Sequence, residues 1–222
     1  MSAKKKFWDD PYQTSLITTV TGAEGARVTL SETIFYAFSG GQQSDKGSIG
    51  GFEVLQAEKV GIDIYYTLPE YHTLCEGDSV EVIIDWDCRY RLMKLHFAAE
   101  LVLETVYQKF NCPEKLGANI TPAKARVDFA WEGSISSIFP ELLSGIQKII
   151  DADLPIISGF ENEKEERRYW EIEGFAKVPC GGTHLKRTGE IGGIQLRRKN
   201  NGKGQERIEI TLAAICAGLP MS

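Results

Sequence analysis

The stretch RLMKLHFAAELVLETVYQKF, residues 91–110, decides how the chain folds. Its apolar residues recur every three or four positions, which is the period of an α-helix. The recurring positions are Leu92, Leu95, Ala99, Val102 and Val106. The Asn-Cys-Pro run at 111–113 predicts the end of this helix. No similar pattern occurs before residue 91, so the helix marks a change of architecture along the chain.

The residues before this helix are typical of short strands, because β-branched and aromatic segments alternate there with glycines. The expected strands are Ser15 to Val20, Ala26 to Leu30, Thr33 to Phe38, Phe52 to Val60, Ile62 to Thr67 and Ser79 to Ile84. Many short strands that are separated by glycine turns predict a small β-barrel.

The residues after the helix mix helical and extended patterns. We expect strands at 124–130, 155–158 and 168–173, a second helix at 140–152, and a hairpin of strands 191–198 and 206–214 around the turn at 200–204. Such a mixture predicts an α+β class. The expected organisation is a β-barrel domain at residues 1–87, followed at residues 88–222 by a two-layer α+β domain with an antiparallel sheet.

The composition is that of an ordinary globular protein, with 42% hydrophobic and 25% charged residues. There is no apolar run long enough to cross a membrane, and the basic start lacks the apolar segment of a secretion signal. Five scattered cysteines make a poor disulfide framework. These features predict a cytoplasmic protein. The net charge of −6 argues against indiscriminate nucleic-acid binding, but it allows a local basic surface such as 196–203.

Four side chains with metal-binding chemistry stand out. His96 and Glu100 are one turn apart on the predicted helix, and Cys180 and His184 flank a glycine pair. Thiolate, imidazole and carboxylate together favour zinc, although each residue could also serve an ordinary packing role. Four protein ligands would make the ion structural. Three would leave an open position, where a bound water has a pKa of about 7. The residues leave open whether Glu100 is a ligand or handles protons.

Several motifs follow one another in a fixed order. They are Glu32-Thr33-Ile34-Phe35-Tyr36, Gly40-Gly41-Gln42, Asp85-Trp86-Asp87, Cys180-Gly181-Gly182-Thr183-His184 and Thr188-Gly189-Glu190-Ile191-Gly192. With these motifs the chain resembles the AlaX alanyl-tRNA editing proteins, which are free-standing relatives of the editing domain of alanyl-tRNA synthetase. The resemblance covers nearly the whole chain.

The resemblance implies a hydrolase that removes a wrong amino acid, serine or glycine, from mischarged tRNA(Ala). It also implies a barrel domain, an α+β editing domain and a Zn2+ ion held by His-x-x-x-His and Cys-x-x-x-His motifs. His96, Cys180 and His184 match these motifs, whereas Glu100 replaces the second histidine. Because a carboxylate can bind zinc, the predicted ligands are His96, Glu100, Cys180 and His184.

Other residues receive roles from the same resemblance or from their charge. Glu100 is a candidate general base, and Thr33 and Gln42 are candidates to line the amino-acid pocket. The candidate tRNA contacts are Arg89, Arg91, Lys186, Arg187, Arg197 and Arg198. Two alternatives stay open: a non-catalytic homologue that binds aminoacyl-tRNA, and a metal-dependent hydrolase of another aminoacyl ester.

Overall fold

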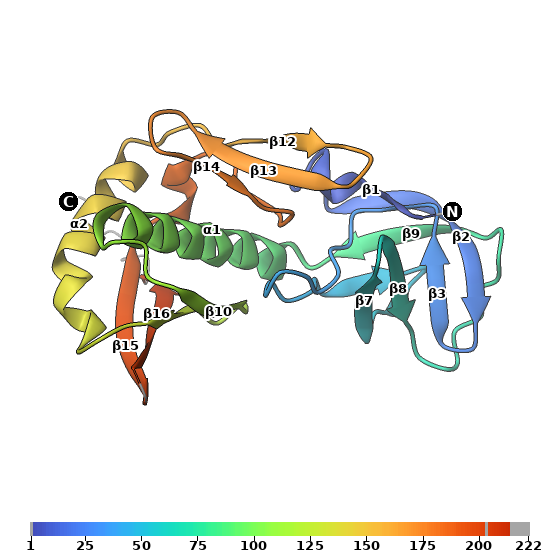
Figure 1. Ribbon diagram of the computed structural model, residues 1–222. Coiled ribbons are helices and arrows are strands. Elements are labelled where there is room, and N and C mark those ends of the chain that lie inside the picture. Colours follow the sequence, from blue (N-terminus) through green and yellow to red (C-terminus); the bar gives the residue numbers. More distant parts are fainter. Residues whose placement is uncertain (1, 203, 214–222) are drawn as a thin grey trace, which may run out of the picture. The chain divides into compact units, whose positions relative to one another are not determined.

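The computed structural model describes residues 2–202 and 204–213, which form two compact units (Figure 1). The units divide between Met93 and Lys94, within helix α1 (Trp86–Lys109). The predicted domain ranges, 1–87 and 88–222, stay predictions. Three features of the sequence lie outside the described residues: Lys203 of the predicted turn, Ala214 at the end of the predicted last strand, and Cys216.

The first unit is built on a seven-stranded antiparallel sheet in the order β6-β5-β9-β2-β3-β8-β7. Its strands are β2 (Ser15–Glu24), β3 (Arg27–Leu30), β5 (Gly47–Ile49), β6 (Phe52–Glu53), β7 (Gln56–Val60), β8 (Asp63–Thr67) and β9 (Ser79–Ile84). A parallel pair joins β1 (Lys4–Lys5) to β4 (Glu32–Thr33), beside the 3-10 helix η1 (Lys6–Trp8). Within the described residues β6 and β7 do not pair with each other, so the sheet is a curled half-barrel, and the predicted small β-barrel is confirmed only in part.

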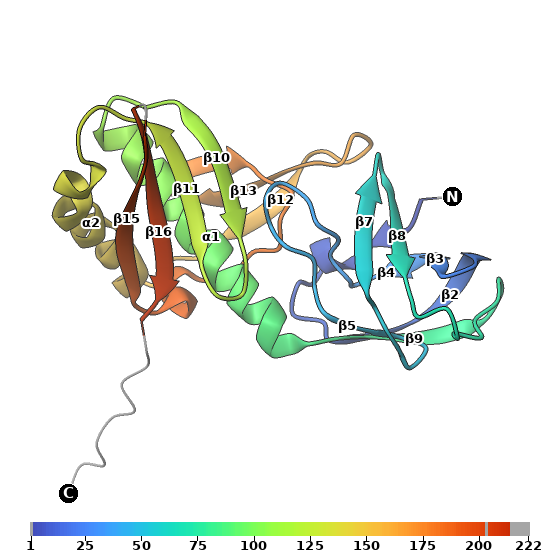
Figure 2. The ribbon, with the colours of Figure 1, turned by 90° about the horizontal axis from the view of Figure 1, so that it is seen from below.

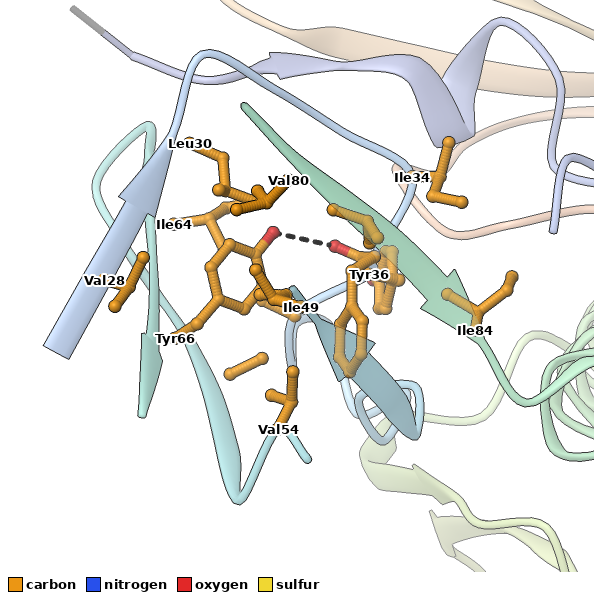
Figure 3. Packing of buried hydrophobic residues seen from close by; sticks show 14 of the residues in the cluster. Val28, Leu30, Ile34, Tyr36, Ile49, Val54, Ile64, Tyr66, Val80 and Ile84 are labelled. Atoms are coloured by element: carbon orange, nitrogen blue, oxygen red, sulfur yellow. Dashed lines mark hydrogen bonds between the residues drawn. The ribbon is translucent and has the colours of Figure 1, made fainter. Parts of the chain in front are cut away.

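The core of the first unit lies inside this curled sheet. Alternate residues of β9 are buried, namely Val80, Val82 and Ile84, as expected for a strand with one apolar face. Ile64 and Tyr66 of β8 are buried in the same way, and these side chains gather in one cluster (Figure 3). The alternation in the sequence therefore sets which face of the sheet is packed.

The segment from Thr33 to Phe38, which we predicted to be a strand, is mostly a loop. Thr33 belongs to β4 and Phe38 forms a single bridge with Glu58 of β7, but two backbone N–H groups between them bond to side chains. The amide of Phe35 donates to Thr33 Oγ1 at 3.0 Å, and the amide of Tyr36 donates to Asp45 Oδ2 at 2.6 Å. The apolar run is buried, which explains its strand-like composition, but its hydrogen bonds are those of a buried loop.

Arg89 and Asp45 form a fully buried ion pair within the first unit. Arg89 Nε donates to Asp45 Oδ1 at 2.7 Å, and the guanidinium also donates to the backbone carbonyls of Pro11 and Ile34, at 2.8 and 2.6 Å. The guanidinium is 0% exposed, so it is not available to a tRNA phosphate. Arg89 is therefore a structural residue, which corrects the role predicted for it from its charge.

The second unit contains two antiparallel sheets. The strands of the four-stranded sheet, in the order β10-β11-β16-β15, are β10 (Lys115–Ile120), β11 (Ala125–Ala130), β16 (Gln205–Leu212) and β15 (Ile194–Gly202). Those of the three-stranded sheet are β12 (Ile157–Asn162), β13 (Arg167–Ile172) and β14 (Ala176–Pro179). The other elements are helix α2 (Phe139–Asp151) and the 3-10 helices η2 (Ile135–Ile138) and η3 (Thr188–Ile191).

The part of α1 in the second unit lies between these two sheets (Figures 1 and 2). Its side chains are buried on nearly every side, including those of Leu95, Ala98, Leu101 and Val106. A helix that is enclosed in this way carries apolar side chains on more than one face. The predicted α+β class is confirmed, but this unit has a sheet on each side of its central helix.

Helix α1 begins at Trp86, five residues earlier than its periodicity predicts. Asp85 caps it, because its Oδ1 accepts the amide hydrogen of Cys88 at 3.0 Å. The second predicted helix is confirmed as α2, with Pro140 in its first turn, and the final hairpin is confirmed as β15 and β16. Among the described residues, no helix is both long and apolar enough to cross a membrane.

Candidate metal centre

Three of the four predicted ligands converge in the second unit. His96 lies on α1, Cys180 follows β14 directly, and His184 lies in the loop before η3. One ligand atom from each residue lies within 4.8 Å of the other two. His96 and His184 are buried and Cys180 is partly buried, so the three side chains form a candidate metal site shielded from bulk water.

The distances within this set fit a tetrahedral zinc ion. Cys180 Sγ is 3.4 Å from His96 Nε2 and 3.2 Å from His184 Nε2. Zinc bond lengths of about 2.3 Å to sulfur and 2.05 Å to nitrogen would place sulfur and nitrogen about 3.6 Å apart at the tetrahedral angle. A small outward shift of the side chains would therefore admit the ion, and one thiolate with two imidazoles is a donor set that suits zinc.

Glu100 lies beside this set, one helical turn after His96. Its Oε1 is 3.3 Å from His96 Nε2 and 4.0 Å from Cys180 Sγ, while its Oε2 accepts a hydrogen bond of 3.2 Å from Trp170 Nε1. The carboxylate thus approaches two of the three ligand atoms and is held by an indole on β13. It is not part of the group whose ligand atoms all lie within 4.8 Å of one another.

The protonation of the two histidines differs because of their surroundings. Burial alone would lower the pKa of His96, but attraction and hydrogen bonding to Cys180 and Glu100 outweigh it and raise that pKa to about 10. Burial, together with the charges of His96 and Arg168, lowers the pKa of His184 well below its usual value. Burial would raise the pKa of Glu100, but the bonds from His96 and Trp170 hold it below its usual range. Cys180 and Glu100 thus favour positive charge on His96, whereas His184 is held neutral.

The Cys180 loop is held in place by the Thr-Gly-Glu motif at 188–190. Glu190 Oε1 accepts the backbone amide hydrogens of Lys186 and Arg187, both at 3.0 Å. Thr188 Oγ1 donates to the carbonyl of Ile149 in α2 at 2.7 Å. A Cβ on Gly189 would lie 2.5 Å from Asp153 Oδ1, so a glycine fits closely there. This motif therefore shapes the loop that carries His184.

Two supporting side chains were not predicted from the sequence. Ser158 Oγ lies 2.9 Å from His184 Nδ1, an outer-shell contact that leaves Nε2 directed at Cys180. Trp170 is fully buried, bonds Glu100 and packs edge-on against Phe97, with their ring centroids 5.1 Å apart. Neither has a short-range signal in the sequence, because Ser158 is 26 residues from His184 and Trp170 is 70 residues from Glu100, and folding brings each pair together.

The predicted pocket residues lie in the first unit and are buried. Thr33 is 0% exposed, and its Oγ1 is 2.6 Å from Tyr66 Oη. Gln42 is 1% exposed, and its backbone amide donates to Ser39 O at 2.9 Å. Their roles in binding an amino acid stay predictions.

The remaining predicted tRNA contacts differ in their exposure and in their ion pairs. Arg91, Lys186 and Arg197 are exposed. Arg187 is exposed but paired with Asp153, with 2.6 Å between Nε and Oδ2. Arg198 is turned to the buried Glu206, with 2.6 Å between Nη2 and Oε1. The charge run at 197–199 therefore does not present all its cations to one side.

Comparison with known protein families identifies the class. The family model for the threonyl and alanyl tRNA synthetase second additional domain matches residues 168–209, which include Cys180 and His184. The chain is also 30% identical to the alanine–tRNA ligase of Ignicoccus hospitalis over 87% of this chain, which corresponds to 24% of the ligase. The chain thus shares an additional domain with the threonyl- and alanyl-tRNA synthetases.

Two free-standing relatives match this chain over most of their own length. The chain is 33% identical to alanyl-tRNA editing protein AlaX-M of Pyrococcus horikoshii, over 94% of this chain and 97% of the relative. It is 35% identical to AlaX-M of Methanosarcina mazei, over 88% and 90%. The chain belongs to the AlaX-M family of alanyl-tRNA editing proteins.

Proposed function

We propose that this protein hydrolyses the ester bond between tRNA(Ala) and a wrong amino acid, serine or glycine. One observation supports this most strongly: His96, Cys180 and His184, which are distant in sequence, bring their ligand atoms within 4.8 Å of one another. They do so in a chain that matches alanyl-tRNA editing relatives over most of its length. A tRNA substrate would place the reaction in the cytoplasm.

His96, Cys180 and His184 would hold Zn2+, because their sulfur and nitrogen atoms suit that ion in type and spacing. A zinc ion held there would supply Lewis acidity toward the ester carbonyl or the attacking water. Ser158 would orient the imidazole of His184 from the outer shell.

Glu100 is the proposed proton acceptor in this reaction. Its carboxylate faces two of the ligand atoms, and the burial of the site strengthens its electrostatic effect. Its pKa is held below the usual range, so it is ionised at neutral pH and can accept a proton from water. Trp170 positions the carboxylate through its other oxygen. The same carboxylate is also close enough to serve as a fourth ligand, so one substitution must separate the two roles.

Selectivity against alanine would come from polar groups in the pocket. A site that hydrogen-bonds the hydroxyl of serine leaves those groups unpaired when the hydroxyl is missing, and this disfavours alanyl-tRNA. Thr33 and Gln42 are the proposed groups. Arg89 and Arg198 are set aside because each is paired with a buried carboxylate. The proposed tRNA contacts that remain are Arg91, Lys186, Arg187 and Arg197.

Glu100→Gln tests the proposed function together with the role of this residue. We expect the wild type to bind about one zinc ion and to release serine from seryl-tRNA(Ala). The variant should keep its zinc but lose about 10²- to 10⁴-fold in the rate of release, because the amide cannot accept the proton. Zinc content by elemental analysis and single-turnover release of serine are the measurements.

Each other outcome has a defined meaning. Loss of zinc in Glu100→Gln would make Glu100 a ligand and contradict its role as base. A wild type that binds tRNA(Ala) but releases no amino acid would contradict the hydrolase and favour the non-catalytic homologue. Release of an amino acid only from other aminoacyl esters would favour the second alternative.

A further inference from the structure

We propose that one face of the four-stranded sheet in the second unit binds the phosphate backbone of a double-helical stem of the tRNA. This surface, called here the basic sheet face, is the side of β10-β11-β16-β15 that is turned away from α1 (Figure 2). Its charged side chains are Lys124, Arg126, Asp128, Arg197, Lys199, Arg207 and Glu209. The inference rests on the proposed function, because it names the surface by which the substrate would be held.

Strand register brings these residues together. Arg126 of β11 pairs with Glu209 of β16, and Glu209 pairs with Arg197 of β15. In the next row of the same face, Asp128 pairs with Arg207, and Arg207 pairs with Lys199. Directly paired residues of neighbouring strands lie on the same side of a sheet, and so do residues two apart on one strand.

The alternate residues confirm which side is packed. Val127 and its partner Ile208 are buried, and so are Ala125 and its partner Ile210 in the neighbouring row, so these residues form an inward apolar face. Arg198 lies between Arg197 and Lys199 on β15 and bonds the buried Glu206. The run of three cations therefore divides, with Arg198 on the packed side and its two neighbours, which are exposed, on the other.

The basic sheet face concentrates positive charge on an acidic protein. Its five cations and two carboxylates give a net charge of three positive, whereas the whole chain carries −6. A protein with net negative charge repels RNA unless its cations are gathered in one place. Their gathering on one face thus favours a polyanion as the partner of this face.

The two carboxylates hold part of the cluster in position. Asp128 accepts hydrogen bonds from Arg207 at 2.6 and 3.0 Å and is also paired with Arg126. Glu209 is paired with Lys124 at 2.5 Å. Side chains held in this way lose less conformational entropy when they bind phosphate. Arg197 and Lys199, on the edge strand, are exposed and are attracted by the charge of Glu209, but neither forms an ion pair with any residue that the structure describes. Both are therefore available to phosphates.

The side chains of the basic sheet face favour contact with the RNA backbone over contact with its bases. Its rows also contain Asn119, Thr211 and Gln195, but no aromatic side chain on which an unpaired base could stack. Proteins recognise double-stranded RNA mainly through its shape, phosphates and 2′-hydroxyls. The acceptor stem of tRNA(Ala) is a double helix of this kind, so contacts here would add affinity without reading the amino acid.

The test compares Arg197→Gln/Lys199→Gln with Lys148→Gln/Lys164→Gln, a matched pair of exposed lysines of the second unit outside this face. Binding of uncharged tRNA(Ala) is measured by fluorescence anisotropy across a series of salt concentrations. We expect the first variant to bind about tenfold more weakly, with a salt slope about 1.8 smaller, since each lost phosphate contact removes about 0.9. The control should stay within about twofold of the wild type.

A small substrate separates this inference from the proposed function. The wild type should hydrolyse seryl-adenosine, which has no helical stem, so this reaction tests the catalytic site without the basic sheet face. An unchanged salt slope, or equal weakening of tRNA binding in the control variant, would overturn the proposal that the basic sheet face binds the tRNA. A wild type that binds tRNA with the expected salt slope but hydrolyses neither ester would refute the proposed function and leave the face in place.

Discussion

Replacing Cys180 with serine is expected to remove the bound zinc and to slow the release of serine from seryl-tRNA(Ala) about a thousand-fold. The sulfur of Cys180 is the shared neighbour of both imidazoles, at 3.4 and 3.2 Å, and a cysteine ligand selects zinc more strongly than the other donors do. A hydroxyl is nearly isosteric but is not ionised at neutral pH. Loss of several kcal/mol of transition-state stabilisation corresponds to this fall in rate.

Zinc content and single-turnover rates on the same preparations measure this effect. Cys75→Ser is the matched control, because Cys75 is exposed in the first unit and should leave both quantities unchanged. Full activity of Cys180→Ser with its zinc lost would show that the metal is not needed for hydrolysis. Retention of zinc would show that Cys180 is not a ligand.

Asp45→Asn is expected to lower the free energy of unfolding by about 3–5 kcal/mol, because it leaves the buried guanidinium of Arg89 without its counter-charge. Asp45 is 5% exposed and Arg89 is 0% exposed, so water cannot replace the lost partner. The carboxylate also accepts the amide hydrogen of Tyr36 at 2.6 Å, which fixes the buried loop. Urea unfolding followed by circular dichroism measures the change.

Glu58→Gln provides the comparison for this prediction. Glu58 pairs with Arg27 at 4.0 Å, and both side chains are 49% exposed. An exposed pair of this kind contributes about 1 kcal/mol or less. If Asp45→Asn cost no more than Glu58→Gln, the buried pair would not be the structural element described above.

The helices were predictable because their signals are local. The period of residues 91–110 requires only neighbouring residues, and α1 follows it. The start of α1 at Trp86 was not predicted, because Asp85 caps the helix through a single hydrogen bond that the period of apolar residues does not reveal. Strand β10 was not predicted, since its sequence, Lys115–Ile120, has little apolar alternation and is stabilised by pairing with β11. Long-range pairing of this kind leaves only a weak signal in one sequence.

The candidate site was predictable in its ligands but not in its surroundings. His96, Cys180 and His184 have rare chemistry at fixed spacings, so they could be named before their convergence was known. The support from Ser158 and Trp170 depends on how a separate sheet packs against α1. The role predicted for Arg89 rested on its charge, and charge alone does not distinguish a surface contact from a buried ion pair.

The most direct test of the central claim is to compare the hydrolysis of seryl-, glycyl- and alanyl-tRNA(Ala) by the zinc-loaded protein. We predict that seryl-tRNA(Ala) is hydrolysed on the order of 10²-fold faster than alanyl-tRNA(Ala), because only serine pairs with the polar groups of the pocket. Equal rates for serine and alanine, or no release of either serine or glycine, would contradict the account.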